Sequence, residues 1–207
     1  MINNERDFED IIKLIIIGNE GVGKSNFLYR FVEGEFCPVH KITVGFDFKS
    51  KICYIPKLKK KVKFQIWDTA GTEKYLSINI NLFQRVQGII LMYDIGDKKS
   101  FDDLEKWMEI VKELGNGIPL ILIGNKIDRD LKNERKISKE KGEEFASNNN
   151  ITFFESSGKN GINVEESFIC LGEKIIKNNF SYGKGEKRYI ISKDKTCNNN
   201  IKKKKCC

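Results

Sequence analysis

The sequence has little of what metal centres and disulfide scaffolds require. Its 207 residues include one histidine and six cysteines, and the cysteines lack the paired spacing of a zinc site. Six cysteines are also too sparse to build a disulfide framework for a chain of this length. We therefore exclude a disulfide scaffold and expect the protein to work in a reducing compartment.

Long hydrophobic runs are also missing. The first apolar run, "IIKLIII" at residues 11–17, is far too short to cross a bilayer. The start, "MINNERDFED", is mixed in charge without an apolar core, and residue 2 is isoleucine where myristoylation needs glycine. We expect that nothing here exports the chain, inserts it into a membrane or myristoylates it.

The excess of positive charge is confined to one end. The formal net charge is +8, but residues 178–207 carry nine Lys or Arg against two acids, which is +7 and leaves about +1 for residues 1–177. A polyanionic membrane surface suits such a tail as well as a nucleic acid does. We expect one domain, residues 1–177, followed by a flexible tail, residues 178–207, which is rich in Asn, Lys and Gly.

Six short runs rich in Ile, Val and Phe are predicted as strands, and helical patterns separate several of them. The predicted strands are residues 13–19, 46–55, 61–68, 88–94, 119–125 and 151–157. Several are apolar on both faces, which is typical of a sheet covered by helices on both sides. The pattern predicts an α/β fold with a mostly parallel six-stranded sheet, whose ligands bind at the carboxyl ends of the strands.

Two helices are predicted from their apolar periodicity. Residues 100–114 begin at a plausible cap, Ser100, with Asp103 three residues on. The predicted buried face of this helix consists of Phe101, Leu104, Met108 and Val111. Residues 163–177 repeat the pattern with Val164, Phe168, Leu171 and Ile175.

The segment "GNEGVGKS", residues 18–25, follows the first predicted strand and fits the phosphate-loop pattern G-x-x-x-x-G-K-[ST]. Its glycines allow successive N–H groups to point at phosphate oxygens, and the following helix adds positive potential. Lys24 is predicted to reach the β- and γ-phosphates, and Ser25 to coordinate Mg²⁺. The alternative is an ordinary glycine-rich turn, which the Lys and Ser in place disfavour.

Guanine selection is predicted for "NKID", residues 125–128, and "SSGK", residues 156–159, at the ends of the fifth and sixth strands. The Asp128 carboxylate can accept from N1–H and N2–H of guanine, a pattern that adenine lacks, and the Gly158 N–H can donate to guanine O6. Asn125 is expected to tie the loops together and the Lys126 stem to lie on the base. An unpaired buried carboxylate costs a few kcal/mol, so this arrangement favours guanine strongly.

The segment "DTAG", residues 68–71, closes the third predicted strand. Asp68 can reach Mg²⁺, usually through water, and Gly71 leaves its backbone N–H open to the γ-phosphate. Thr43 lies between the phosphate-loop helix and the second strand, where its hydroxyl could complete the Mg²⁺ shell when a γ-phosphate is bound. The alternative is that Thr43 only begins the strand.

Together these motifs resemble the Ras superfamily of small GTPases, over about residues 8–178. The segments "VGFDF", "KFQIWDTAG", "GIILMYD", "GNKID" and "ESSGKN", with the terminal "CC", resemble the Rab branch. The resemblance implies a P-loop NTPase-type fold, GTP and GDP with Mg²⁺ as ligands, and a monomer that works with effectors, an exchange factor, an activating protein and a prenyl-binding chaperone.

The same resemblance implies the residues of the site. The expected catalytic residues are Lys24, Gly71 and Thr72. The expected nucleotide contacts are Glu20, Gly21, Val22, Gly23, Lys24, Ser25, Asn26, Phe36, Thr43, Gly71, Asn125, Lys126, Asp128, Ser157, Gly158 and Lys159. The expected metal ligands are Ser25, Thr43 and Asp68.

The tail ends "IKKKKCC", residues 201–207. A solvated charge run or a metal-binding pair would be the alternatives, but Rab-like chains that end in "CC" carry geranylgeranyl groups on both cysteines. The resemblance therefore implies lipidation at Cys206 and Cys207. Two lipid chains anchor a protein stably where one does so marginally, and Lys202–Lys205 add about 1 kcal/mol each on anionic lipid.

The sequence departs from the family pattern at several positions. Thr72 stands where the family has the Gln that orients the attacking water, and Glu20 stands where a small residue is usual. Slow intrinsic hydrolysis follows as an expectation. Phe48, Trp67 and Leu82 occupy the positions of the effector-reading aromatic triad, and Leu82 departs from it.

The roles of three further residues can be interpreted in more than one way. Phe36 is interpreted as stacking on guanine, with plain core packing as the alternative. The only histidine, His40, is assigned to a loop rather than to catalysis, and Trp107 to packing.

Three functions from different classes remain. The first is a membrane-anchored GTP/GDP switch in vesicle trafficking, on the cytoplasmic face of endomembranes with a cytosolic pool. The second is a largely GTP-bound recruitment module with negligible hydrolysis. The third, a basic nucleic-acid binder, is disfavoured because the charge excess lies in the tail and no readout motif accompanies it.

Overall fold

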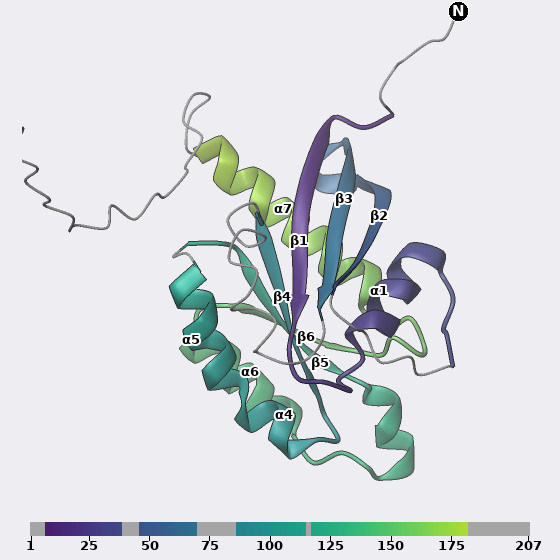
Figure 1. The fold of residues 1–207 in the computed structure, drawn as a ribbon, viewed down its shortest axis with the longest axis vertical. Coiled ribbons are helices and arrows are strands. Elements are labelled where there is room, and N and C mark those ends of the chain that lie inside the picture. Colours follow the sequence, from purple (N-terminus) through teal and green to yellow (C-terminus); the bar gives the residue numbers. More distant parts are fainter. Residues whose placement is uncertain (1–6, 39–45, 70–85, 115–116, 182–207) are drawn as a thin grey trace, which may run out of the picture.

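The computed structural model describes residues 7–38, 46–69, 86–114 and 117–181. Its centre is a six-stranded sheet in the order β2-β3-β1-β4-β5-β6, and all neighbours pair in parallel except β2 and β3 (Figure 1). The strands are β1 (Asp10–Ile17), β2 (Phe46–Ile55), β3 (Lys60–Thr69), β4 (Gly88–Asp94), β5 (Leu120–Asn125) and β6 (Thr152–Ser156). The predicted α/β fold with a mostly parallel six-stranded sheet is confirmed.

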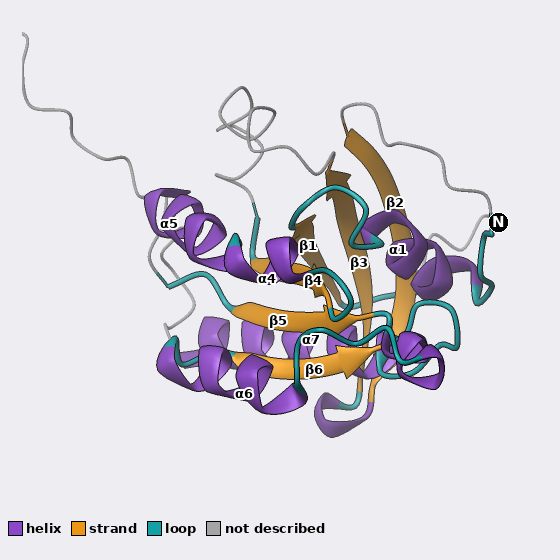
Figure 2. Cartoon of the chain, turned by 90° about the horizontal axis from the view of Figure 1, so that it is seen from below, coloured by secondary structure: helices purple, strands orange, loops and turns teal. Residues whose placement is uncertain are grey.

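Helices cover both faces of this sheet. The helices are α1 (Lys24–Glu33), α4 (Lys98–Asp102), α5 (Leu104–Leu114), α6 (Lys139–Asn148) and α7 (Val164–Ser181), with 3₁₀ turns η1 (Pro56–Leu58) and η2 (Ile127–Lys132). Figure 2 shows α4 beside β4 and α6 beside β6, with α1 beside β2 and β3. None of the helices in the described ranges is both long and apolar enough to cross a membrane.

Two apolar layers follow from the alternation of side chains along each strand. In β1, Ile12, Leu14 and Ile16 face α1 and α7, whereas Ile15 and Ile17 face α5 and α6. On the first side, aromatic rings from three elements pack together. They are Phe31 and Phe168, stacked at 3.7 Å between ring centroids, and Phe27 and Phe64 beside them. Both layers exclude water from the sheet, which fixes the strand ends that carry the candidate site.

The two predicted amphipathic faces are confirmed, but one helix start was wrong. The predicted face of α7 is buried throughout. The predicted single helix 100–114 is divided at Asp103 into α4 and α5, so that Leu104, Met108 and Val111 are buried in α5, whereas Phe101 lies in α4 and is half-buried. Ser100, however, is not the cap, because Asp97 accepts a hydrogen bond from the Lys99 N–H at 3.1 Å and the helix begins at Lys98. Ser100 is buried instead, and its hydroxyl donates to the Asp97 carbonyl at 2.8 Å.

The start of the predicted tail was also wrong by one helical turn. Residues 178–181, which were assigned to the flexible tail, form the last turn of α7. No proline or glycine lies between Gly172 and Gly183, so the backbone hydrogen bonds of the helix continue beyond its last core contact. The lipid sites, Cys206 and Cys207, and the lysine run 202–205 lie outside the described residues.

Tyr93 offers a test of the packing. Its ring is fully buried, and its hydroxyl has no hydrogen-bond partner among the residues that the structure describes. Burial raises the pKa of the phenol well above its usual value, so the group stays protonated. Because an unsatisfied buried hydroxyl costs about 1–3 kcal/mol, we expect Tyr93→Phe to raise the free energy of unfolding by about 1 kcal/mol.

Denaturant unfolding of the full chain measures this change. Tyr54→Phe is the matched control, because Tyr54 is exposed and its hydroxyl should contribute almost nothing. A loss of stability in Tyr93→Phe would mean that the hydroxyl has a partner, such as a buried water, and would contradict the prediction.

Candidate functional site

The segment between β1 and α1 has the backbone conformation that a phosphate loop requires. Gly18 approaches the backbone of β4 so closely that a Cβ atom would lie 2.2 Å from the Met92 carbonyl oxygen, and its φ is +136°. Gly23 has a φ of +98°, and a Cβ there would lie 2.7 Å from the Asn125 amide nitrogen. Both positions therefore require glycine. The ordinary-turn alternative predicts no such constraint.

Lys24 is the first residue of α1, and its side chain folds back over the loop. It is buried, and its Nζ donates to the carbonyl oxygens of Gly18 at 2.8 Å and Asn19 at 2.9 Å. Burial lowers the pKa of Lys24 from 10.5 to about 8, although the charges of Asp68 and Glu20 oppose this shift. A phosphate beside Nζ would stabilise the charged ammonium and raise the pKa of Lys24 back toward its usual value. The buried lysine therefore favours the binding of a phosphate at this loop.

This shift predicts proton uptake on nucleotide binding. At pH 8.5 most free protein should carry a neutral Lys24, whereas the phosphates of GDP favour the charged form. We expect GDP binding to take up a proton at pH 8.5 and almost none at pH 7. Calorimetric titration in two buffers of different ionisation enthalpy measures this difference. Lys24→Arg is the control, because arginine stays charged at both pH values, and proton release in the wild type at pH 8.5 would contradict the prediction.

Asn125 joins three loops at the carboxyl end of the sheet, as predicted from the sequence. Its amide nitrogen donates to the Val22 carbonyl oxygen at 2.9 Å. Its amide oxygen accepts from the Ser156 hydroxyl at 3.1 Å and from the Gly158 N–H at 3.2 Å. This buried side chain thereby fixes the phosphate loop against both predicted base-binding loops.

Asp128 is also held in place. Its Oδ1 accepts from the Ser157 hydroxyl at 2.7 Å, an orienting bond that the sequence reasoning missed. The Gly158 N–H, predicted to serve guanine O6, donates to Asn125 at a distance near the long limit for such bonds. Arg30 of α1 holds the same loop by donating to the carbonyl oxygens of Gly158 at 2.9 Å and Lys159 at 2.5 Å.

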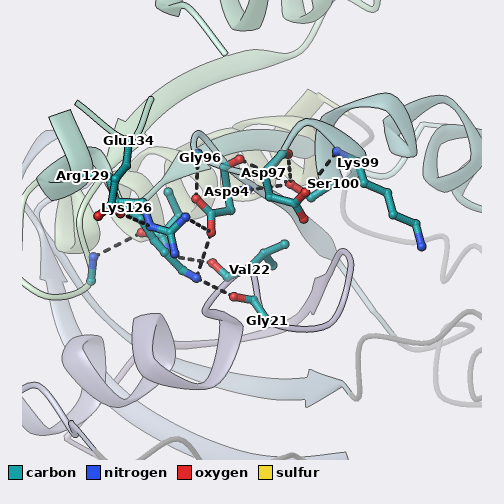
Figure 3. A network of polar contacts seen from close by, with 12 residues as sticks. Gly21, Val22, Asp94, Gly96, Asp97, Lys99, Ser100, Lys126, Arg129 and Glu134 are labelled. Carbon is teal, nitrogen blue, oxygen red and sulfur yellow. Dashed lines mark hydrogen bonds and ion pairs between the residues drawn. The ribbon is translucent and has the colours of Figure 1, made fainter. Parts of the chain in front are cut away.

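Lys126 connects the base side of the site to the phosphate loop. Its Nζ donates to the Gly21 carbonyl oxygen at 2.6 Å and lies 2.9 Å from the buried carboxylate of Asp94 (Figure 3). The other Asp94 oxygen accepts from the Gly96 N–H at 2.8 Å, and Arg129 lies 3.4 Å from the first. Asp94 therefore anchors the Lys126 stem that was predicted to lie on the base.

The roles of Asp94 and Arg30 were not predicted from the sequence. For Asp94 a signal was present, because a carboxylate ends a strand that is otherwise entirely apolar and buried. For Arg30 no local signal was available, because it reaches carbonyl groups 128 and 129 residues away in the sequence.

Ser25 and Asp68 supply oxygen ligands at one point. The Ser25 hydroxyl donates to the Asp68 carboxylate, which is buried at the end of β3. Hydroxyl and carboxylate oxygens suit Mg²⁺, which keeps waters and phosphate oxygens as its other ligands. No group of three His, Cys, Asp or Glu side chains in the described ranges could hold a metal alone. This donor set therefore fits Mg²⁺ bound together with a nucleotide.

Other predicted site residues lie around the same edge. Glu20 is exposed, Asn26 is half-buried in the first turn of α1, and Phe36 is half-buried just after that helix and outside both core clusters. The stacking of Phe36 on guanine stays a prediction. The predicted residues His40, Thr43, Gly71, Thr72 and Leu82 lie outside the described residues.

Phe48 and Trp67 form a pair of rings 5.2 Å apart on the face of β2 and β3 opposite to α1 and α7, where Phe48 is 48% exposed.

Comparisons with known proteins agree with this geometry. The model of the Ras family matches residues 13–177. "Ras-related protein Rab-13" of Rattus norvegicus is 39% identical over 170 residues, which is 82% of each chain. "Ras-related protein SEC4" of Candida albicans is 37% identical over 209 residues, with 99% of this chain and 97% of that protein covered. "Ras-related protein Rab-12" of Mus musculus is 43% identical over 168 residues, with 80% and 68% covered.

Proposed function

Because the chain belongs to the Ras family, and within it to the Rab branch of small GTPases, we propose that it is a membrane-anchored switch in vesicle trafficking. In this role it alternates between GTP- and GDP-bound forms. The GTP-bound form recruits effectors, an exchange factor loads GTP, and an activating protein accelerates hydrolysis. We place the protein on the cytoplasmic face of endomembranes, with a cytosolic pool held by a prenyl-binding chaperone.

The Asn125 side chain carries the nucleotide part of the proposal. It bonds the phosphate loop at Val22 and the SSGK loop at Ser156 and Gly158, while Asp128 follows it by three residues in sequence. A phosphate-binding segment and a carboxylate suited to guanine are thereby held in one rigid unit. A carboxylate in this position favours guanine over adenine, because adenine cannot donate two hydrogen bonds to it.

In the proposed mechanism, the chain itself binds and positions the triphosphate. Backbone N–H groups of residues 20–26 surround the phosphates, and Lys24 places its ammonium group beside the β- and γ-phosphates. Ser25, Asp68 and Thr43 would hold Mg²⁺, which neutralises charge on the β- and γ-phosphate oxygens. Gly71 would donate its N–H to the γ-phosphate, and Thr72 would face the attacking water. Positioning contributes most of the rate in this reaction class.

A second candidate function is a recruitment module that stays GTP-bound and hydrolyses almost nothing. Thr72 and Glu20, which depart from the family pattern, favour it. Single-turnover GTP hydrolysis separates the two functions, because a recruitment module would hydrolyse almost none of its bound GTP. A nucleic-acid role is not part of the proposal, because the positive charge lies in residues 178–207.

Membrane anchoring is tested at the tail. We expect Cys206→Ser with Cys207→Ser to abolish membrane association, because stable anchoring needs two lipid chains. Replacing Lys202–Lys205 by serine should only weaken or redirect binding, since each lysine adds about 1 kcal/mol. Membrane flotation and imaging of a protein tagged at its N-terminus measure both effects.

Two controls make this result specific. Cys197→Ser removes a cysteine in the same tail and should leave membrane association unchanged. Full membrane retention of the double variant would refute the lipid anchor, and retained nucleic-acid binding after removal of residues 182–207 would refute the interpretation of the charge.

A further inference from the structure

The side chain of Asn19, the second residue of the phosphate loop, is held between two residues of a distant helix pair. The Trp107 indole N–H of α5 donates to Asn19 Oδ1 at 2.7 Å. Asn19 Nδ2 donates to Asp103 Oδ2 at 2.8 Å, and Asp103 is the residue between α4 and α5. These partners lie 88 and 84 residues away in the sequence. We refer to Trp107, Asn19 and Asp103 as the clamp.

An amide suits this position because the two partners make opposite demands. Trp107 can only donate, and the ionised Asp103 can only accept. The hydrogen bond from Lys106, and to a smaller extent that from Asn19, holds the pKa of the Asp103 carboxyl below its usual range. Asp103 is therefore ionised at neutral pH. A carboxylate at position 19 would satisfy Trp107 but would place two negative charges against each other.

The clamp also bears on Lys24. The Asn19 backbone carbonyl oxygen accepts from Lys24 Nζ at 2.9 Å, and the Gly18 carbonyl accepts from the same group at 2.8 Å. Asn19 therefore contacts the helix pair through its side chain and the lysine ammonium through its backbone. Because Trp107 is packed in the core at 3% exposure, the helix side of the clamp is rigid.

We propose that Asn19 is a positioning residue for the phosphates, and that the clamp fixes the carbonyl group that aims Lys24 at the β-phosphate. This inference rests on the proposed phosphate role of Lys24. It assigns Trp107 a hydrogen-bonding role beyond the packing expected from the sequence. It also makes the break between α4 and α5 part of the nucleotide site.

The test uses the full chain, freed of nucleotide and titrated with GDP and with GMP. GMP lacks the β-phosphate, so a defect transmitted through Lys24 should weaken GDP binding and leave GMP binding almost unchanged. For Asn19→Asp we expect GDP affinity to fall about tenfold to a hundredfold, the range that one charged contact commands. Trp107→Phe, which keeps a ring but removes the donor, should lose GDP affinity in the same selective way by about tenfold.

A second substitution should rescue the first. Asp103→Asn added to Asn19→Asp restores one donor facing one acceptor, so GDP affinity should return to within about threefold of wild type. Asp102→Asn, at the exposed neighbouring carboxylate, removes the same charge without reaching Asn19 and should not rescue. Thermal melting identifies variants that do not fold, and in that case Trp107→Phe and the rescued double variant decide the question.

Three results would overturn the inference. These are unchanged GDP affinity in Asn19→Asp and Trp107→Phe, equal losses for GDP and GMP, or rescue by Asp102→Asn as large as rescue by Asp103→Asn. A wild type that does not bind GDP at all would instead refute the proposed function. Selective loss with rescue at position 103 alone supports the clamp.

Discussion

Replacing Asp128 by asparagine is expected to move the base preference of the site from guanine to xanthine. The Asp128 carboxylate can accept from both N1–H and N2–H of guanine, whereas an amide presents one acceptor and one donor. Xanthine has a carbonyl group where guanine has its amino group, so it matches the amide. Sites built around such hydrogen bonds discriminate strongly, and we expect a loss of GDP affinity on the order of 10³-fold or more.

Competition titrations with GDP, XDP and ADP measure this change. The matched control is Asp130→Asn, because Asp130 lies two residues further on and pairs with Arg135 at 2.5 Å rather than with Ser157. The control should keep its preference for GDP. Comparable affinity of the wild type for ADP and GDP would contradict the assignment of the base site, and so would a preference of Asp128→Asn for GDP over XDP.

The strands could be predicted closely from the sequence because β4 and β5 are buried on both faces, whereas β2 and β3 alternate between buried and more exposed residues. β4 matches the predicted residues 88–94, and β2 the predicted residues 46–55. A parallel sheet between two helical layers produces continuous apolar runs, which are hard to mistake in a chain of mixed charge. β1 begins three residues earlier than predicted, because Asp10, Ile11 and Ile12 continue the ladder with β3 although they include the charged, half-buried Asp10.

The motifs of the site could also be identified from the sequence, because each lies at the carboxyl end of a strand. The hydrogen bonds that join these motifs could not be predicted. The bond from Asn125 to Val22 spans 103 residues, and that from Lys126 to Gly21 spans 105. Such contacts depend on the order of the strands in the sheet, which local periodicity does not encode. The motif spacing therefore predicted which motifs lie at this edge of the sheet, but not the contacts that Asp94, Arg30 and Asn19 make with them.

The misplaced helix start has a similar origin. Ser100 is a good capping residue by type, but Asp97 precedes it and caps first. The structure uses Ser100 inside the fold, where its hydroxyl accepts from the Asp94 N–H at 3.0 Å. Both residues are capping types, so only the tertiary contact with the end of β4 decides between them.

Thr72→Gln, alone and with Glu20→Ser, is expected to accelerate GTP hydrolysis. At position 72, directly after the segment 68–71, the Rab-like pattern has a glutamine that orients the attacking water. The short hydroxyl of Thr72 cannot span the same distance. We expect the wild type to hydrolyse below about 10⁻⁴ s⁻¹. Since a small misplacement of reacting groups costs on the order of a hundredfold, restoring the glutamine should raise the rate by about tenfold to a hundredfold.

The two substitutions should contribute unequally. The Glu20 side chain is exposed, and among the influences on the pKa of Lys24 its charge comes after burial and after Asp68. Solvent screens such a charge, so Glu20→Ser alone should change the rate by less than about threefold. Single-turnover hydrolysis of preloaded GTP measures all variants, and Glu35→Ser, an exposed acid beyond the end of α1, serves as the surface control. If the wild type already matches the double variant, slow hydrolysis is wrong and Thr72 positions the water by another geometry. If an added activating protein raises the wild-type rate as far as that of the double variant, the partner supplies the glutamine. The activating protein then sets the lifetime of the GTP-bound form.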